Sequence, residues 1–261
     1  MKTEQLSGSE ILRVQNLFKF FDELKALDGV DIGVKEGDIT LVIGPNGSGK
    51  TTLINCICGF YPSNGGHVYF NGEDITNKPP HSIFDSGIVR TFQIPQPLKL
   101  LTVLENLLIT DYNPGEGIFK SMGRSWESVE EETVEKAFEV LEFLEIAHLW
   151  DTLASQLSGG QLKLVEVGRA MMTDAKLVVM DEPVAGVNPI LAKTILNRIR
   201  DLKKRGYSFL IVEHRLDLVL PYVDYIYVMA KGKVFAQGVE EEIMQNKEVI
   251  EVYLGDIHEG P

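Results

Sequence analysis

The fold is decided by one stretch of the sequence, Gly44-Pro45-Asn46-Gly47-Ser48-Gly49-Lys50-Thr51. A continuous apolar run at residues 39–43 precedes it, and a helical pattern at about residues 51–58 follows it. Strand, glycine-rich turn and helix in this order fit the phosphate-binding loop pattern G-x-x-x-x-G-K-[ST]. The context argues against an idle glycine loop. The stretch therefore predicts an α/β fold that binds a nucleoside triphosphate.

Each residue type in this stretch suits contact with a triphosphate. The glycines let backbone N–H groups curl around phosphate oxygens, and the helix that follows adds the positive end of its dipole. Lys50 can bridge the β and γ oxygens, and the hydroxyl of Thr51 can reach magnesium. We therefore expect ATP and Mg²⁺ as ligands, with Lys50 also acting in catalysis. The expected ATP-binding residues are Gly44, Pro45, Asn46, Gly47, Ser48, Gly49, Lys50, Thr51 and Thr52.

Two carboxylates follow a second apolar strand, at residues 177–180. Asp181 and Glu182 would lie at the carboxyl edge of the sheet, where open α/β folds bind their ligands. We expect Asp181 to hold magnesium through water and Glu182 to polarise the attacking water. Alone, the pair could be a solvated acidic turn before Pro183. Beside a phosphate loop, it favours catalysis.

A second small-residue turn, Leu157-Ser158-Gly159-Gly160-Gln161, leads into a predicted helix at about residues 162–171. The start of that helix is again a backbone anion site. As a bare pattern, the turn would usually be a flexible loop, but it precedes the acidic strand by about 20 residues. Because residues 44–51 already cradle one triphosphate, this turn is best used on a nucleotide held by another chain. That arrangement implies a head-to-tail pair of chains with two-fold or pseudo-two-fold symmetry.

The rest of the chain alternates strand and helix patterns. Strands are predicted at residues 11–14 and 209–212, and a short hairpin strand at residues 67–70 lies between glycine-containing turns. Residues 102–170 are mostly helical and begin with Thr102 and Glu105 spaced as a capping box. Strands that alternate with helices indicate a parallel sheet.

Two helices in these patterns have readable features. One is predicted at residues 189–205, with Asn188 before it and Gly206 after it. Val134, Ala137, Phe138, Leu141 and Leu144 recur at helical spacing in the other, and we expect residues 130–132 in its first turns, where the dipole favours negative charge.

Composition narrows the class of protein. A formal net charge of −13 over 261 residues argues against sequence-independent binding to nucleic acid or anionic lipid. The spacing of Cys56 and Cys58 matches neither a zinc site nor a thioredoxin-like pair, so we expect two small core residues in a reducing compartment. The sequence contains no secretory h-region and no apolar run long enough for a membrane span. We therefore expect a cytoplasmic location that still allows docking on a membrane protein.

The three motifs together resemble the nucleotide-binding subunit of an ATP-binding-cassette (ABC) transporter, over about residues 11–255. The resemblance implies a P-loop NTPase core with a mostly parallel sheet, an antiparallel β subdomain and an inserted helical subdomain at about residues 95–172. It also implies one ABC ATPase domain at residues 10–255, between a polar tail at residues 1–9 and a C-terminal tail at residues 256–261.

The resemblance assigns further site residues. Gln93 matches the glutamine that contacts magnesium and reports the nucleotide state to the membrane subunits, and otherwise it is a polar residue at a strand end. His214 matches the histidine that hydrogen-bonds the γ-phosphate, although a lone histidine there would usually be a surface residue. Phe21 matches the aromatic that stacks on adenine, with Phe20 as its rival and a plain core aromatic as the simpler alternative.

Asn188 departs from the commoner family pattern. Many relatives have aspartate at this place in the loop between the two nucleotide sites, so the departure puts cross-talk between those sites in doubt. An equally good interpretation is that Asn188 caps the helix that starts at Pro189.

The resemblance also implies partners. These are a second ABC ATPase subunit, identical or paralogous, membrane permease subunits and, indirectly, a solute-binding protein, at the cytoplasmic face of the membrane. Between Gln93 and Thr102 lies a stiff segment with two prolines, in which Leu98 and Leu100 would be exposed only if a partner covered them. The alternative is that both leucines pack into the helical lobe.

Several short stretches of the sequence resemble the subfamily that serves branched-chain amino-acid importers. They lie at residues 88–93, 101–108, 113–126 and 253–255, in the Ala-Gly-x-Asn-Pro loop and in the pair Glu213-His214. Close relatives of the same subfamily serve urea or other amides. The pocket that recognises the solute lies on other chains, so this sequence does not identify the solute.

Competing classes are disfavoured by single features. A soluble cassette ATPase of repair or translation would be expected to carry a second cassette or a long coiled-coil insertion. A P-loop kinase or GTPase would lack the motif at residues 157–161. A non-catalytic regulatory cassette would be expected to lose Lys50 or Glu182, and both are present.

Overall fold

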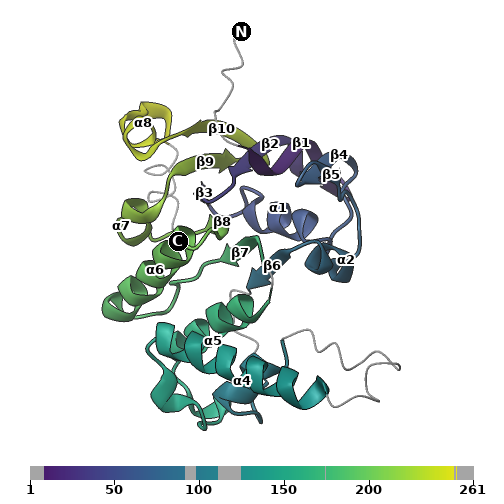
Figure 1. Cartoon of the computed structure of the whole chain (residues 1–261). Helices are drawn as coiled ribbons and strands as arrows, with labels where there is room; N and C mark the ends of the chain where they lie inside the picture. The colour runs from purple at the N-terminus through teal and green to yellow at the C-terminus, as the bar shows by residue number, and fades with distance from the viewer. Residues whose placement is uncertain (1–8, 92–97, 111–124, 174, 250, 252–261) are drawn as a thin grey trace.

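The computed structural model describes residues 9–91, 98–110, 125–173, 175–249 and 251, without the side chains of residues 125–130. In these residues a central six-stranded sheet has the order β10-β9-β3-β8-β7-β6 (Figure 1). Every neighbouring pair is parallel except β9 with β10. The strands are β3 (Ile39–Ile43), β6 (Ile88–Thr91), β7 (Leu177–Asp181), β8 (Ser208–Val212), β9 (Tyr225–Ala230) and β10 (Lys233–Gly238).

This sheet confirms the predicted strands at residues 39–43, 177–180 and 209–212. Strand β8 lies between β3 and β7, and its register pairs Val212 with both Val42 and Asp181. The carboxyl ends of these three strands therefore meet at one edge. The segments that leave them carry the glycine-rich loop, the two carboxylates and His214.

A smaller antiparallel sheet, in the described residues, has the order β2-β1-β4-β5. Asn71 and Gly72 connect β4 to β5 with φ angles of 50° and 80°, a conformation that two-residue hairpin turns require. The hairpin strand predicted at residues 67–70 is thus confirmed. The strands are β1 (Glu10–Phe21), β2 (Leu24–Lys35), β4 (Gly65–Phe70) and β5 (Glu73–Asp74).

Both faces of the central sheet are buried. In β3, Ile39, Leu41 and Ile43 pack into one apolar core, and Val42 packs into the other. The first core is shared with helices α6 (Pro189–Lys204), α7 (Leu216–Val219) and α8 (Glu240–Gln245), and the second with α1 (Lys50–Ile57), α2 (Pro80–Asp85) and the antiparallel sheet. This two-sided burial explains why these strands are continuous apolar runs.

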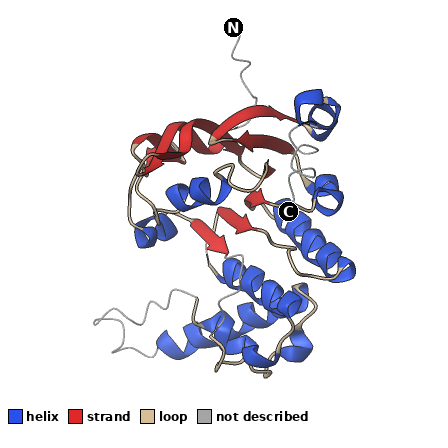
Figure 2. Ribbon diagram, turned by 180° about the vertical axis from the view of Figure 1, so that it is seen from behind, coloured by secondary structure: helices blue, strands red, loops and turns tan. Residues whose placement is uncertain are grey.

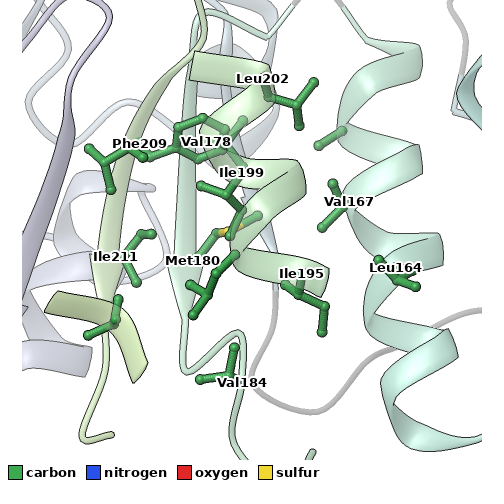
Figure 3. Close-up of a cluster of buried hydrophobic side chains, with 14 of the residues drawn as sticks. Leu164, Val167, Val178, Met180, Val184, Ile195, Ile199, Leu202, Phe209 and Ile211 are labelled. Atoms are coloured by element: carbon green, nitrogen blue, oxygen red, sulfur yellow. The ribbon is translucent and has the colours of Figure 1, made fainter. Parts of the chain in front are cut away.

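Helix α6 lies between strands β7 and β8 on one side and helix α5 (Gly159–Met172) on the other (Figure 3). Ile195 and Ile199 of α6 are fully buried there, beside Met180 and Leu164. Each such isoleucine contributes roughly 1.5–3 kcal/mol through burial. This packing fixes the first turns of α6 and α5 relative to the edge of the sheet.

Helices α3 (Val103–Leu108), α4 (Ser125–Phe143) and α5 form a lobe at the opposite end of the molecule from the antiparallel sheet (Figure 2). The capping box of Thr102 and Glu105 is confirmed, since each side chain accepts a hydrogen bond from the other residue's backbone N–H. Helix α4 begins at Ser125, so residues 130–132 lie in its second turn. Short 3-10 helices follow at Ala147–Leu149, Ala154–Gln156 and Leu220–Tyr222.

Two smaller findings concern composition. Cys56 and Cys58 are buried free thiols, as predicted, and burial raises the pKa of Cys56 to about 11 and that of Cys58 to about 12. Among the helices of the described residues, none combines the length and apolar character that crossing a membrane requires.

Candidate functional site

The glycine-rich loop leaves β3 and ends where α1 begins, at Lys50. Gly49 precedes the helix with a φ of 104°, and a Cβ built there would lie 2.5 Å from the carbonyl oxygen of Ala26. Lys50 Nζ donates to the carbonyl oxygens of Gly44 at 2.8 Å and Pro45 at 2.9 Å. The loop thus wraps around a buried ammonium group, while Thr51 is exposed beside it. This is the arrangement that an anion-binding cradle needs.

Asp181 is the last residue of β7 and is almost fully buried. Burial raises the pKa of its carboxyl group, and the guanidinium of Arg90, with Nη2 3.4 Å from Asp181 Oδ2, counteracts part of that rise. A desolvated carboxylate beside a phosphate loop is well suited to a divalent cation.

Glu182 turns sharply out of the sheet. Its φ of 52° lies in the left-handed region, which is uncommon for a residue with a side chain, and its backbone N–H donates to the carbonyl oxygen of Val212 at 2.8 Å. Its carboxylate Oε1 lies 3.2 Å from Nε2 of His214, which follows β8. The structure therefore brings Glu182 and His214 together, while their parts in ATP hydrolysis stay predictions.

The motif at residues 157–161 lies at the start of α5. Ser158 is the N-cap and forms a capping box with Gln161, so the helix begins at Gly159, three residues earlier than predicted. The predicted helix start at about residue 162 was wrong, because Ser158 and Gln161 cap the helix and residues 159–161 form its first turn. Gly159 has open space around it, whereas a Cβ on Gly160 would lie 2.1 Å from Leu191 Cδ2. Gly160 is therefore required by packing.

Asn188 is the N-cap of α6, and its Oδ1 accepts a hydrogen bond from the backbone N–H of Leu191 at 3.0 Å. The capping interpretation of Asn188 is thus confirmed. Leu191 also contacts Gly160, so the Asn188 turn lies beside the start of α5. Any part of Asn188 in communication between two nucleotide sites stays a prediction.

Phe21 ends β1 and is partly exposed. Its ring packs edge-on against Tyr61, with centroids 5.4 Å apart, and Lys19 Nζ lies 4.9 Å from its centroid. The strand that follows runs back past the phosphate loop at Ala26, which approaches Gly49. Phe20 instead packs near Phe18. Stacking of Phe21 on adenine stays a prediction, and Gln93 lies outside the described residues.

Comparison with known proteins decides the family. The sequence profile of the family described as ABC transporter matches residues 27–185, more than half of the chain. The chain belongs to the ABC transporter family. The protein of Archaeoglobus fulgidus named probable branched-chain amino acid transport ATP-binding protein LivG is 65% identical to this ABC cassette over 246 residues, which cover 94% of the cassette and 96% of the relative. The protein of the same name from Methanocaldococcus jannaschii is 56% identical over 252 residues, 95% and 98% of the two chains.

A solved structure confirms the fold. An ATP-binding cassette of an ABC transporter in its ADP conformation matches this cassette with a TM-score of 0.83 and 56% identity, over 95% of this chain and 99% of that one. The cassette is therefore a nucleotide-binding ATP hydrolase with an α/β core, as the sequence motifs predict.

Two residues of the cassette's site were missed by the sequence motifs. Arg90 of β6 joins Asp181 to Asn55 of α1, with Nη1 2.5 Å from Asn55 Oδ1, and stacks over Phe60. Lys163 of α5 donates from Nζ to the carbonyl oxygen of Glu182 at 2.6 Å. The only local signal was a basic residue beside apolar residues in sequence, with Val89 before Arg90 and with Leu162 and Leu164 on either side of Lys163.

Proposed function

We propose that this cassette is the ATP-hydrolysing subunit of an importer for branched-chain amino acids. The observation that carries the proposal is the contact of Glu182 with His214 beside the phosphate loop, in a chain 65% identical to a relative named for branched-chain amino-acid transport. The proposed ABC ATPase domain covers residues 10–255, with the helical subdomain at about residues 95–172.

The chemistry follows from the residues at the edge of the sheet. Lys50 would leave its backbone acceptors to bind the β and γ oxygens of ATP, and the backbone N–H groups of residues 46–49 would bind the same phosphates. Glu182 would accept a hydrogen bond from the attacking water and polarise it. His214 would donate a hydrogen bond to the γ-phosphate and, through its contact with Glu182, hold both groups in one geometry.

The donor set fits Mg²⁺. Asp181 offers a buried carboxylate and Thr51 an exposed hydroxyl, both hard oxygen ligands, and Gln93 is the third proposed ligand. When bound, the ion supplies neutralisation of charge on the phosphate oxygens. Arg90, which pairs with Asp181, favours the ionised form of that carboxylate and opposes part of the effect of burial.

A second ATPase subunit is the first proposed partner, arranged head-to-tail. Gly159, at the open start of α5, would contact the nucleotide held by the other subunit. Ile190, in the first turn of α6 beside this motif, is 82% exposed, an exposure that a second subunit would cover. The pair could consist of identical or paralogous chains.

Membrane permeases are the second proposed partner, at the cytoplasmic face of the membrane, together with a solute-binding protein. Leu98 is 44% and Leu100 is 88% exposed just before the capped helix α3. The alternative that both leucines pack into the helical lobe is wrong for Leu100. We propose that a permease covers these two side chains.

Uptake of labelled leucine tests the function. The cassette would be reconstituted in vesicles with its cognate permeases and binding protein, and leucine and urea would be supplied in parallel. Leucine uptake that requires ATP and Mg²⁺ on the side of the membrane where the cassette is bound supports the proposal. Uptake of urea alone would assign the amide importer class, and uptake of neither solute would reject the subfamily.

A further inference from the structure

Glu213 directly follows β8 and is buried, with only 1% of its surface exposed. Its Oε1 accepts a hydrogen bond from the backbone N–H of Val184 at 2.9 Å. Its Oε2 accepts from the backbone N–H groups of His214 at 2.8 Å and Arg215 at 3.1 Å. One carboxylate therefore binds two separate segments of backbone, one with each oxygen.

These two segments carry the groups that meet at the site. Val184 lies two residues after Glu182, and its side chain is fully buried in the core shown in Figure 3, so this segment is anchored on both sides. His214 directly follows Glu213. The carboxylate of Glu213 thus ties together the backbone segments that carry Glu182 and His214, whose side chains lie 3.2 Å apart.

The ammonium group of Lys163 makes a further contact with the backbone of Glu182. Lys163 donates to the carbonyl oxygen of Glu182, and its ammonium group interacts electrostatically with Glu213. Burial lowers the pKa of Lys163, and the nearby carboxylates of Glu213, Glu182 and Glu166 oppose that effect. A buried carboxylate is tolerated when hydrogen bonds and an opposite charge compensate it, and Glu213 has both.

We infer that Glu213 is a positioning residue for ATP hydrolysis, fixing the carboxylate of Glu182 and the imidazole of His214 at one spacing. The inference rests on the proposed function, in which those two groups act on the water and the γ-phosphate. Charge-assisted hydrogen bonds to backbone N–H groups are short and directional, so they suit this task. A displacement of about 1 Å at reacting groups can cost on the order of 100-fold in rate.

The substitution Glu213→Gln separates positioning from folding. Glutamine keeps the volume but has only one acceptor oxygen, and its NH₂ group would face N–H donors, so one of the two segments loses its hydrogen bond. We expect kcat for ATP to fall roughly 10- to 100-fold, with KM and the affinity for ATP within about twofold of the wild type. The control is Glu242→Gln, which changes a carboxylate that accepts from the Val239 backbone N–H far along the chain, and it should leave kcat unchanged.

A mutant cycle with His214→Ala supplies a measurement that general destabilisation would not reproduce. If Glu213 acts through the Glu182–His214 pair, Glu213→Gln should cost much less in kcat when it is combined with His214→Ala. If Glu213→Gln does not fold, Glu213→Asp keeps the charge but is too short to reach both segments, and it should also lower kcat at unchanged KM.

The outcomes distinguish this role from the proposed function. A wild-type chain with no Mg-ATPase activity would overturn the proposed function and this role with it. A wild-type chain that hydrolyses ATP, together with a Glu213→Gln chain whose kcat is within about twofold of it, would overturn the positioning role alone. The role is likewise overturned if Glu213→Gln lowers kcat by the same factor in the wild-type chain and in the chain that carries His214→Ala.

Discussion

His214 Nε2 lies 3.2 Å from Glu182 Oε1, although the two residues leave different strands. Strands β7 and β8 are neighbours whose register pairs Asp181 with Val212, so the segments after them emerge side by side. The left-handed backbone at Glu182 turns its side chain toward His214. The proposed water-polarising carboxylate and the proposed donor to phosphate thereby lie at the edge of the sheet that also carries the loop around Lys50.

Lys50→Ala should remove most of the binding of Mg-ATP. The buried ammonium group is the charge that the loop wraps around, and loss of one partner of a buried charge contact costs about 2–5 kcal/mol, or roughly 30-fold or more in affinity. Calorimetric titration measures the change, with the exposed Lys247→Ala as control. Wild-type affinity in Lys50→Ala would remove the assignment of this loop.

Asp181→Asn should keep or raise thermal stability at pH 7 without Mg²⁺ and should lose Mg²⁺-dependent turnover. Burial raises the pKa of Asp181 above its ordinary value of 3.8. As the pH rises from 3.8 to the higher pKa of the folded state, Asp181 loses its proton first in the unfolded chain. The free energy of unfolding therefore falls over this pH range and stays lower above the folded pKa. Asparagine avoids this cost, and its amide oxygen can still accept the hydrogen bond from Arg90 Nη2. Thermal melts at pH 7 and at pH 4 measure it, and a clearly lower melting temperature at pH 7 for Asp181→Asn would contradict the prediction.

The parts of the fold that the sequence predicted are those with a local cause. The apolar run before Gly44, the pair Thr102 and Glu105, and Asn188 before Pro189 each act within a few residues, and all are confirmed. The strand that ends in Asp181 was equally clear because both faces of the central sheet are buried.

The parts that escaped prediction depend on contacts between distant segments. Strand β10 lies at the edge of the sheet beside β9, and most of its residues are half-buried or exposed, so its sequence gives a weak signal. The contact of Arg90 with Asp181, and that of Lys163 with Glu182, join different elements through packing that no local spacing encodes. Val184 and Glu213 meet for the same reason, because β7 and β8 are adjacent in space.

Asn188→Ala should lower the free energy of unfolding by about 1 kcal/mol, the usual loss for an N-cap. Asn188→Asp should stay close to the wild type, because a carboxylate also caps the Leu191 N–H. Denaturant unfolding of the isolated chain measures both variants. Equal stability of Asn188→Ala and the wild type would show that the cap does not stabilise α6.

Leu98→Glu should leave the ATPase rate of the isolated chain nearly intact and should uncouple it from solute uptake. A charged side chain on the proposed docking surface opposes contact with an apolar permease segment. Met244→Glu, at an equally exposed apolar position on α8, is the matched control. Uptake per ATP hydrolysed in reconstituted vesicles is the quantity to compare, and unchanged uptake in Leu98→Glu would reject the docking surface.

The central claim, that Glu182 polarises the water in a site completed by a second chain, is tested most directly by Glu182→Gln. The amide cannot polarise water, so turnover should fall by about 100-fold or more while ATP still binds. Trapped ATP should then hold two chains together, and light scattering at saturating Mg-ATP should give twice the mass of the monomer. A Glu182→Gln chain that hydrolyses ATP at the wild-type rate, or stays strictly monomeric at high concentration, would contradict this account.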